Sequence, residues 1–171
     1  MLKNLRDFAF EETLQLEIES SAGQFPPQDS LGREELALLV NGQGQLAITP
    51  LHMALIMSAI GRDETMPVPH LVESVTLEQE TLLFQTQSEV LARPISIQVA
   101  AELRDIMSSV AKSGLTELTS GIPPHSIVMG FAPVDDPRHA ISVVIENGGR
   151  GEEEIRTIAQ QIVRVVLEIR E

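Results

Sequence analysis

The chain has 171 residues, carries a formal net charge of −13 at pH 7 and contains no cysteine. Its hydrophobic content of 43% and charged content of 22% are typical of one folded domain, or of a large piece of a bigger one. The negative charge argues against nucleic acid and against an anionic membrane surface as partners, and the lack of cysteine excludes disulfides and thiolate metal sites.

The N-terminal part of the sequence predicts short elements joined by a loop. Apolar positions at helical spacing predict a short helix within residues 2–9, whereas the alternation in residues 14–18 predicts a half-buried strand. Residues 20–32 contain two glycines and two prolines, which indicates a loop. Residues 34–40 fit either a helical turn or a strand, and the sequence leaves both interpretations open.

The strongest element is a helix that we expect to begin after Thr49. The Thr49 side chain can accept a hydrogen bond as the N-cap, and Pro50 fits the first helical position, where its missing N–H costs nothing. The next ten residues include only two polar ones, His52 and Ser58. We therefore expect this helix to be buried on nearly all sides, with Gly61 as its left-handed C-cap.

A hairpin and a second helix are predicted next. Short extended runs at residues 70–76 and 81–87 fit two paired strands. Pro94 then starts a helix, with Ser96 as its N-cap and Gly114 as its stop. This helix is predicted to be amphipathic, because its apolar residues recur at helical spacing in one stripe (Val99, Leu103, Ile106 and Val110).

The clearest strands lie near the C-terminus. Residues 126–132 and 140–145 are apolar runs joined by turn formers, which predicts an antiparallel pair in a sheet covered on both faces. Residues 152–170 predict a helix across that sheet, beginning with three carboxylates and carrying one apolar stripe (Ile155, Ile158, Ala159, Ile162, Val166 and Ile169). The fold class that we expect is α/β (α+β), an antiparallel sheet flanked by helices in a single domain over residues 1–171.

Short motifs in a fixed order carry a resemblance to a known family. They are Gly42-Gln43-Gly44, Ile48-Thr49-Pro50-Leu51, Met53-Ala54 and Pro69-His70-Leu71-Val72. This arrangement resembles the late part of the transpeptidase domain of penicillin-binding proteins, although His52 and Val68 stand where that family usually has Gln and Lys. The run Gly130-Phe131-Ala132-Pro133 is similar to the start of the family's last strand pair. The resemblance implies part of a serine β-lactamase/transpeptidase-like fold.

The resemblance also implies acyl-transfer chemistry, but the nucleophile half of the family domain is missing here. In the family, a Ser-x-x-Lys turn supplies the nucleophile and base, a Ser-x-Asn loop assists, and a Lys-Thr/Ser-Gly strand lines the substrate carboxylate. No Ser-x-Asn occurs in this sequence. Ser109-Val110-Ala111-Lys112 has the first spacing, yet it falls at the end of a predicted helix, so we interpret it as accidental. We expect the chain by itself to be inactive.

Lys112-Ser113-Gly114 fits the third family motif, and two alignments are open for it. In the first alignment, these three residues bind substrate, with Leu115 where a threonine usually follows. In the second, residues 107–114 are the end of the helix and its loop, and the catalytic strand has been shortened out between Gly114 and Ser126. We prefer the second alignment because the helical stripe runs unbroken to Val110.

The four histidines show no metal-ligand spacing, so we expect neither a metal nor a cofactor. His52 is predicted to be a hydrogen-bonded core or boundary residue, and His125 a structural one. No apolar run approaches the roughly 20 residues that span a bilayer.

The resemblance implies a location in the cell envelope and a link to peptidoglycan cross-linking and penicillin binding. The partner that we expect is the N-terminal half of the transpeptidase domain or a cell-wall or cell-division protein. In the alternative interpretation, the chain is a non-enzymatic scaffold that binds such a partner.

Overall fold

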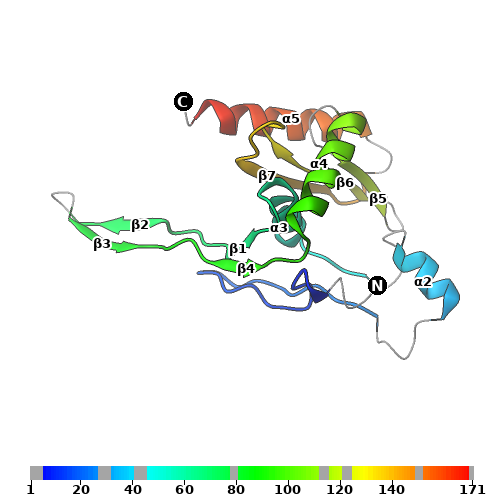
Figure 1. Cartoon of the computed structure of the whole chain (residues 1–171), viewed down its shortest axis with the longest axis horizontal. Helices are drawn as coiled ribbons and strands as arrows, with labels where there is room; N and C mark the ends of the chain where they lie inside the picture. Colours follow the sequence, from blue (N-terminus) through cyan, green and yellow to red (C-terminus); the bar gives the residue numbers. More distant parts are fainter. Residues whose placement is uncertain are drawn as a thin grey trace.

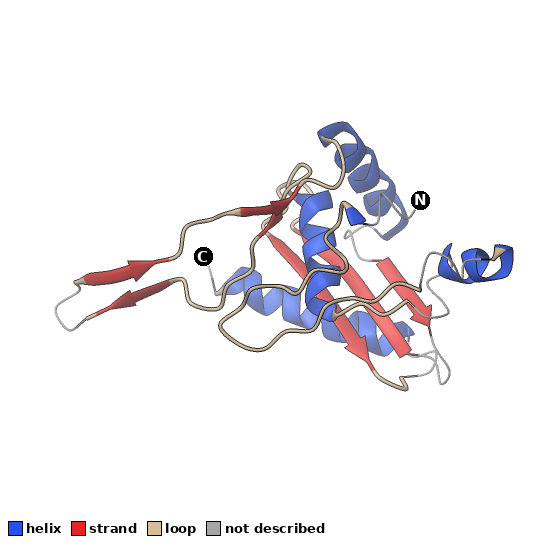
Figure 2. Ribbon diagram, turned by 90° about the horizontal axis from the view of Figure 1, so that it is seen from below, coloured by secondary structure: helices blue, strands red, loops and turns tan. Residues whose placement is uncertain are grey.

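A three-stranded antiparallel sheet forms the centre of the protein (Figure 1). The structure, a computed structural model, describes residues 6–26, 32–40, 46–77, 81–111, 116–120, 125–148 and 152–169. The strand order is β5-β6-β7, with bounds Thr116–Ser120, His125–Ala132 and His139–Ile145. Figure 2 shows these strands side by side, with one helix in front of them and another crossing behind.

Helices α3 (Pro50–Gly61) and α5 (Glu152–Glu168) cover opposite faces of this sheet. Successive residues of a strand point to opposite faces, and β6 follows this rule. Val128 packs against α5, whereas Phe131 packs against α3. The predicted antiparallel pair, covered on both faces by these two helices, is therefore confirmed.

Helix α3 begins and is buried as the sequence predicts. Thr49 lies in extended conformation as the N-cap, and its side chain accepts a hydrogen bond of 3.2 Å from the backbone N–H of His52. Pro50 occupies the first turn, where no backbone donor is required. No residue from Leu51 to Gly61 is exposed, and the buried ones cover most of the helix circumference (His52, Met53, Leu55, Met57, Ala59, Ile60 and Gly61).

The predicted role of Gly61 as a left-handed C-cap is wrong. Gly61 is the last residue of α3, and the left-handed conformations follow it at Asp63 and Glu64, with φ of 50° and 77°. Glycine suits position 61 for a different reason. A Cβ atom there would lie 3.1 Å from the Cβ of Pro137 and 3.4 Å from the Cβ of Phe131, so a side chain would push against neighbours that the helix end approaches closely.

An arginine of helix α4 (Ile97–Ala111) closes the C-terminal end of α3. Arg104 Nη1 donates hydrogen bonds to the carbonyl oxygens of Ile60 at 3.0 Å and Gly61 at 3.1 Å. The same nitrogen lies 2.7 Å from the Asp63 carboxylate. A cation at this position satisfies helix-terminal carbonyls and matches the negative end of the helix dipole.

Helix α4 starts as predicted, but its apolar stripe is only partly buried. Ser96 Oγ accepts a hydrogen bond of 3.3 Å from the N–H of Val99, which confirms the N-cap. Leu103 packs against the core, whereas Val99 and Ile106 are 41% and 58% exposed. Only part of the stripe is therefore packed, because α4 contacts the core along the side that contains Leu103. The side chain of Val110 lies outside the described residues.

The stripe predicted for α5 also divides into a buried and an exposed part. Ile155 and Ala159 are buried against the sheet, at 1% and 0% exposure. Ile158, Ile162 and Ile169 are exposed. A helix on a flat sheet buries only the line of residues nearest to the strands, so the outer part of a wide stripe faces away.

Of the N-terminal predictions, the strand at residues 14–18 is wrong. Residues 14–18 form no strand, although Leu14 is buried in the cluster around Leu55. In the predicted helix of residues 2–9, positions 1–5 lie outside the described residues and the remainder forms a turn. Residues 34–40 are helical, within α2 (Arg33–Val40). The glycine turn at residues 42–44 lies outside the described residues.

The predicted hairpin is confirmed, and it projects away from the rest of the molecule (Figure 1). Strands β2 (Ser74–Thr76) and β3 (Leu82–Gln85) pair antiparallel. A second short pair, β1 (Met66–Pro67) with β4 (Val90–Ala92), joins its base to the core and was not predicted. Two- and three-residue strands are too short to show an alternating pattern.

The burial of α3 leads to a stability prediction. Leu55 is 5% exposed and packs against Leu14, Ala59 and Met66, so Leu55→Ala leaves a cavity in the core. We expect the free energy of unfolding to fall by about 2–5 kcal/mol. Urea unfolding followed by circular dichroism measures this change.

Ile106→Ala provides the matched control, because Ile106 is a helical aliphatic residue that faces outward. Its expected effect is within about 0.5 kcal/mol. Equal losses for the two variants would contradict the burial of α3.

Candidate functional site

The edge strand β5 is the candidate functional element, because it follows the Lys-Ser-Gly motif. Thr116 pairs with Met129 and Ser120 pairs with His125 in the antiparallel ladder. A strand is therefore present between Gly114 and Ser126, where the preferred alignment expected none. Within the described part of the chain, β5 pairs with β6 alone, so its outer edge has no neighbouring strand.

The predicted substrate-binding residues Lys112, Ser113 and Gly114 lie outside the described residues. They belong to the connection between the end of α4 at Ala111 and the start of β5 at Thr116. Chain connectivity thus leads from this motif directly into the edge strand.

Ser109 lies in the last turn of α4 and lacks the surroundings of an acylating serine. Its Oγ donates a hydrogen bond of 2.7 Å to the carbonyl oxygen of Ile106 in the preceding turn. The C-terminal turn of a helix also carries negative partial charge, which opposes the build-up of an oxyanion. The geometry agrees with the interpretation of Ser109-Val110-Ala111-Lys112 as accidental.

His52 is a hydrogen-bonded core residue, as predicted. Its side chain is 1% exposed, and Nε2 lies 2.8 Å from the carbonyl oxygen of Phe8, to which it donates. Nδ1 has no hydrogen-bond partner within the described part of the chain. The ring therefore ties the N-terminal segment to α3.

His125 connects the start of β6 to the turn after β7. Its Nδ1 accepts a hydrogen bond of 3.0 Å from the backbone N–H of Asn147, which has a left-handed φ of 57°. This contact supports the structural role expected for His125. Across the residues that the structure describes, no group of three or more His, Asp or Glu side chains converges as metal ligands would.

Glu17 makes an electrostatic contact that the sequence analysis missed. Its Oε2 accepts a hydrogen bond of 3.0 Å from the N–H of Leu71, and its Oε1 accepts one of 3.3 Å from the N–H of Val72. These backbone donors, that of Leu71 foremost, lower the pKa of Glu17 below its ordinary value of 4.5, with a smaller contribution from His70. The sequence carries no signal for this contact, because the partners are 54 and 55 residues away.

The sheet, its two covering helices and the motif order together define a class of protein. The sequence matches the family described as "Penicillin binding protein transpeptidase domain" over residues 1–168. The chain therefore belongs to this family, and the resemblance seen in the sequence is confirmed.

Individual relatives agree with this assignment. The chain is 31% identical to peptidoglycan D,D-transpeptidase PbpA of Mycolicibacterium smegmatis over 150 residues, which are 77% of this chain and 30% of that protein. The crystal structure of PBPA from Mycobacterium tuberculosis is 26% identical, with a TM-score of 0.77 over 85% of this chain and 37% of that one.

The D,D-transpeptidase domain of a peptidoglycan glycosyltransferase from Eggerthella lenta shows the likeness in fold over nearly the whole chain. It superimposes with a TM-score of 0.85 at 23% identity, over 99% of this chain and 47% of that one. The fold is thus the serine β-lactamase-like fold of these domains, as predicted. The chain spans less than half the length of each of these relatives.

The contact of Glu17 with Leu71 and Val72 predicts a dependence on pH. A carboxylate with a lowered pKa stabilises the folded state above the ordinary value of 4.5 and loses this effect as the pH falls through the lowered pKa. We expect the amide signals of Leu71 and Val72 to shift together when NMR spectra are followed from about pH 6 to about pH 3.

In Glu17→Gln the two amides should show no such titration. Glu19→Gln serves as the control, because Glu19 is a nearby exposed carboxylate, and it should leave the titration unchanged. A midpoint above 4.5, or the same curve in Glu17→Gln, would contradict the contact.

Proposed function

We propose that this chain is the sheet-side part of a peptidoglycan D,D-transpeptidase domain, in which β5 and the preceding Lys112-Ser113-Gly114 recognise the carboxylate of the substrate. The observation that supports this proposal is the edge strand that begins two residues after the motif. Family members use a Lys-Thr/Ser-Gly strand for this purpose, so the first of the two sequence alignments is now the better one.

The chemistry of an edge strand suits this role. Its outward N–H and C=O groups can pair with an extended peptide, as in other cases of strand addition. A lysine in the connection that precedes the strand can add a charge-assisted hydrogen bond to a carboxylate. Both interactions position a substrate, but neither supplies a nucleophile.

The acylating serine must come from polypeptide outside these 171 residues. Ser109 has the required spacing to Lys112 but the wrong helical environment, and the sequence has no Ser-x-Asn motif. Relatives named as D,D-transpeptidases are more than twice as long as the stretch they share with this chain. We therefore propose that the chain binds substrate without transferring an acyl group on its own.

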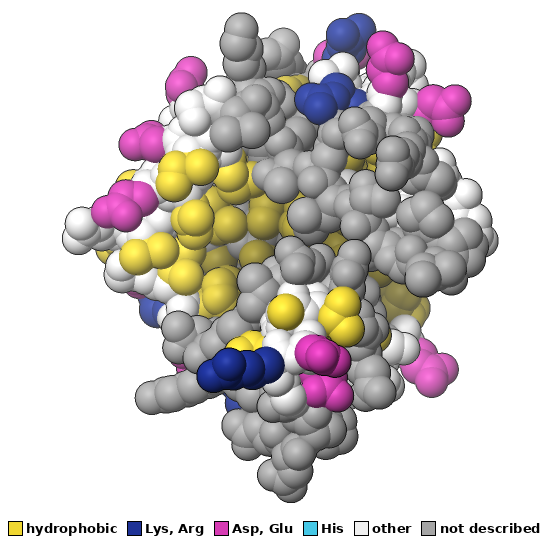
Figure 3. Space-filling view, turned by 90° about the vertical axis from the view of Figure 1, so that its right-hand side faces the viewer, with side chains coloured by type: hydrophobic (Ala, Val, Ile, Leu, Met, Phe, Trp, Pro, Cys, Tyr) yellow, Lys and Arg dark blue, Asp and Glu magenta, His cyan; other side chains and the backbone are white. Residues whose placement is uncertain are grey.

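Exposed apolar surface on this chain supports the proposal that another part of the domain packs against it. Hydrophobic side chains gather in a hollow on one side of the molecule (Figure 3). Val99 and Ile106 of α4 and Ile158 and Ile162 of α5 are exposed on helices that otherwise pack inward. The occupant that we propose for these faces is the remainder of the transpeptidase domain. The family to which the chain belongs suggests the cell envelope as its location. No helix in the described ranges is long and apolar enough to cross a membrane.

A scaffold without transpeptidase chemistry is the second candidate. The exposed apolar side chains of the β2–β3 hairpin favour it, since such side chains mark interaction surfaces. In this case the chain binds a cell-wall or cell-division protein and no peptide carboxylate.

Recognition of a carboxylate separates the two candidates. We expect a short peptide with a free C-terminal carboxylate to shift the amide signals of residues 116–120 in NMR spectra, and the C-terminal amide of the same peptide to shift them much less. Lys112→Ala should abolish the difference. Lys3→Ala removes the only other lysine and should preserve it. Equal shifts with acid and amide, or no shifts at all, would favour the scaffold.

Covalent labelling by a β-lactam tests the missing nucleophile. An acyl adduct requires an activated serine, a base and an oxyanion hole in one cleft. Incubation with penicillin should leave the intact mass of the chain unchanged under conditions that label a complete D,D-transpeptidase. A stoichiometric mass increase that disappears in Ser109→Ala would show that Ser109 is the nucleophile and overturn this part of the proposal.

A further inference from the structure

The β2–β3 hairpin is an apolar ribbon that nothing in the described structure covers. Every residue of both strands is exposed. Val75 and Phe84 form a cross-strand pair, and Phe84 is 53% exposed. An isolated two-stranded ribbon gains little stability in water, and exposed apolar patches on soluble proteins mark interaction sites.

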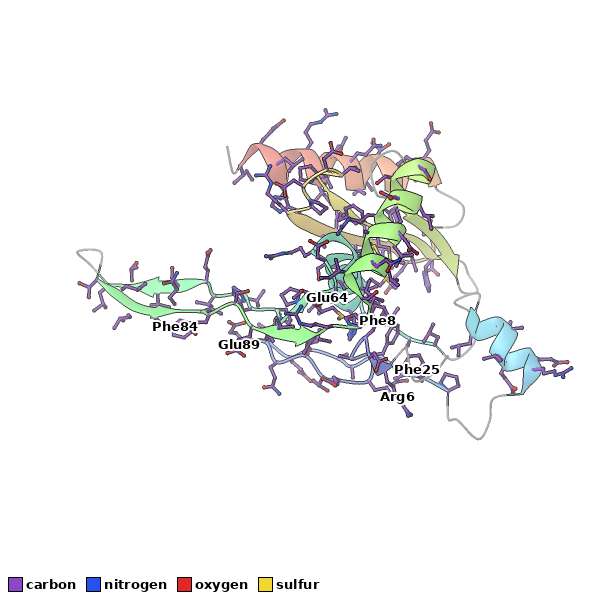
Figure 4. The ribbon with its side chains drawn as sticks, in the orientation of Figure 1. Arg6, Phe8, Phe25, Glu64, Phe84 and Glu89 are labelled. Carbon is purple, nitrogen blue, oxygen red and sulfur yellow. The ribbon has the colours of Figure 1, made fainter. Side chains whose placement is uncertain are left out.

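A groove of about 580 Å³ lies at the base of this ribbon. Three extended segments line it: residues 15–17, residues 68–70 and residues 84–87 together with Glu89. Phe84 and Glu89 line it from the strand that leads to β4, and Figure 4 shows both beside this part of the chain. Apolar side chains and a carboxylate therefore face the same opening.

Unpaired backbone lines one wall of the groove. The two arms of the ribbon are hydrogen-bonded on either side of this stretch. At one end the N–H of Val68 donates to the carbonyl oxygen of Glu89, and at the other the N–H of Thr86 donates to the carbonyl oxygen of Glu73. Between these contacts, Gln87 and Ser88 make no backbone hydrogen bond within the described part of the chain. On the other arm of the ribbon, the N–H groups of Leu71 and Val72 donate to the Glu17 carboxylate instead of to Gln87 or Ser88. Exposed and unpaired backbone of this kind can receive an added strand.

The charged residues between Arg62 and Arg93, the part of the sequence that contains the ribbon, are all acidic. Between Arg62 and Arg93 the sequence has no lysine or arginine, and it has six carboxylates (Asp63, Glu64, Glu73, Glu78, Glu80 and Glu89). Asp63 and Glu64 are paired with Arg104 and Arg93. Glu89 has no ion-pair partner among the described residues, and it is exposed in the lining of the same groove as Phe84.

The geometry points to a docking site for an extended segment of another protein that alternates arginine or lysine with apolar residues. The guest backbone pairs with Gln87 and Ser88, and its apolar side chains cover Leu16 and Phe84. One basic side chain pairs with the carboxylate of Glu89, and the side chain that covers the ring of Phe84 is apolar or places a second cation over it.

Charge argues against two other occupants of this surface. A second copy of the chain would bring carboxylates against carboxylates, and an anionic lipid surface would repel the ribbon in the same way. The site is also separate from β5, because the groove is lined by the N-terminal segment and the ribbon and by no residue of the central sheet.

NMR titration of the full chain with a capped peptide of alternating valine and arginine tests this inference. We expect saturable shifts at residues 15–17 and 84–89, with no change at residues 116–120. Glu89→Gln should weaken binding by about fivefold, the upper range for an exposed ion pair, and Phe84→Ala should weaken it further. Added salt should also weaken binding.

Two controls make the result decisive. Glu168→Gln removes one exposed carboxylate from α5 and should leave the affinity unchanged. The same peptide with glutamate in place of arginine should not bind. Absence of saturable shifts, equal weakening by Glu168→Gln and Glu89→Gln, or binding of the acidic peptide would each overturn the inference. So would a concentration-dependent dimer that buries the ribbon.

Discussion

The burial of α3 is the constraint on which the rest of the structure depends. A helix with so few polar residues must be surrounded, and each surrounding element contributes a specific contact. The sheet covers one side through Phe131, and the N-terminal segment covers another through Leu14. His52 ties that segment to the helix at Phe8, and Arg104 closes the last turn. The buried helix α3 therefore positions elements that are distant from one another in the sequence.

The same packing explains why the molecule has faces that this chain does not cover. The sheet has both faces protected but has unpaired outer edges among the described strands. Helices α4 and α5 turn only their inner residues to the core, so Ile106 and Ile162 point outward. These features agree with a chain that spans less than half of the relatives it matches. This arrangement is compatible with the proposal that β5 binds substrate at the sheet edge while the nucleophile comes from polypeptide outside these 171 residues.

The sequence predicts the elements with strong local signals and misses those that depend on distant partners. Thr49 and Pro50 define the start of α3, and the apolar runs of β6 and β7 define the central strand pair. The sequence does not predict strand β5, because the apolar stripe that runs unbroken to Val110 favours the end of a helix and its loop there. The exposed halves of the α4 and α5 stripes could not be anticipated, since a stripe shows its width but not how much of it a neighbour covers.

The candidate site was predictable in part for the same reason. The Lys112-Ser113-Gly114 motif is visible in sequence, whereas its position before an edge strand requires the sheet register. The contact between Glu17 and the amides at residues 71–72 has no local signature at all. It fixes the base of the ribbon from a segment that the sequence assigned to a strand.

Native-state hydrogen exchange of the full chain tests the central role of α3 most directly. Amides of α3, β6 and β7 should exchange slowest and with one common free energy of opening, because they form a single cooperative core. Amides of β2 and β3 should exchange much faster, since the ribbon has no buried contacts. Fast exchange in α3, or slow exchange in β6 and β7 that persists when α3 has opened, would contradict the account.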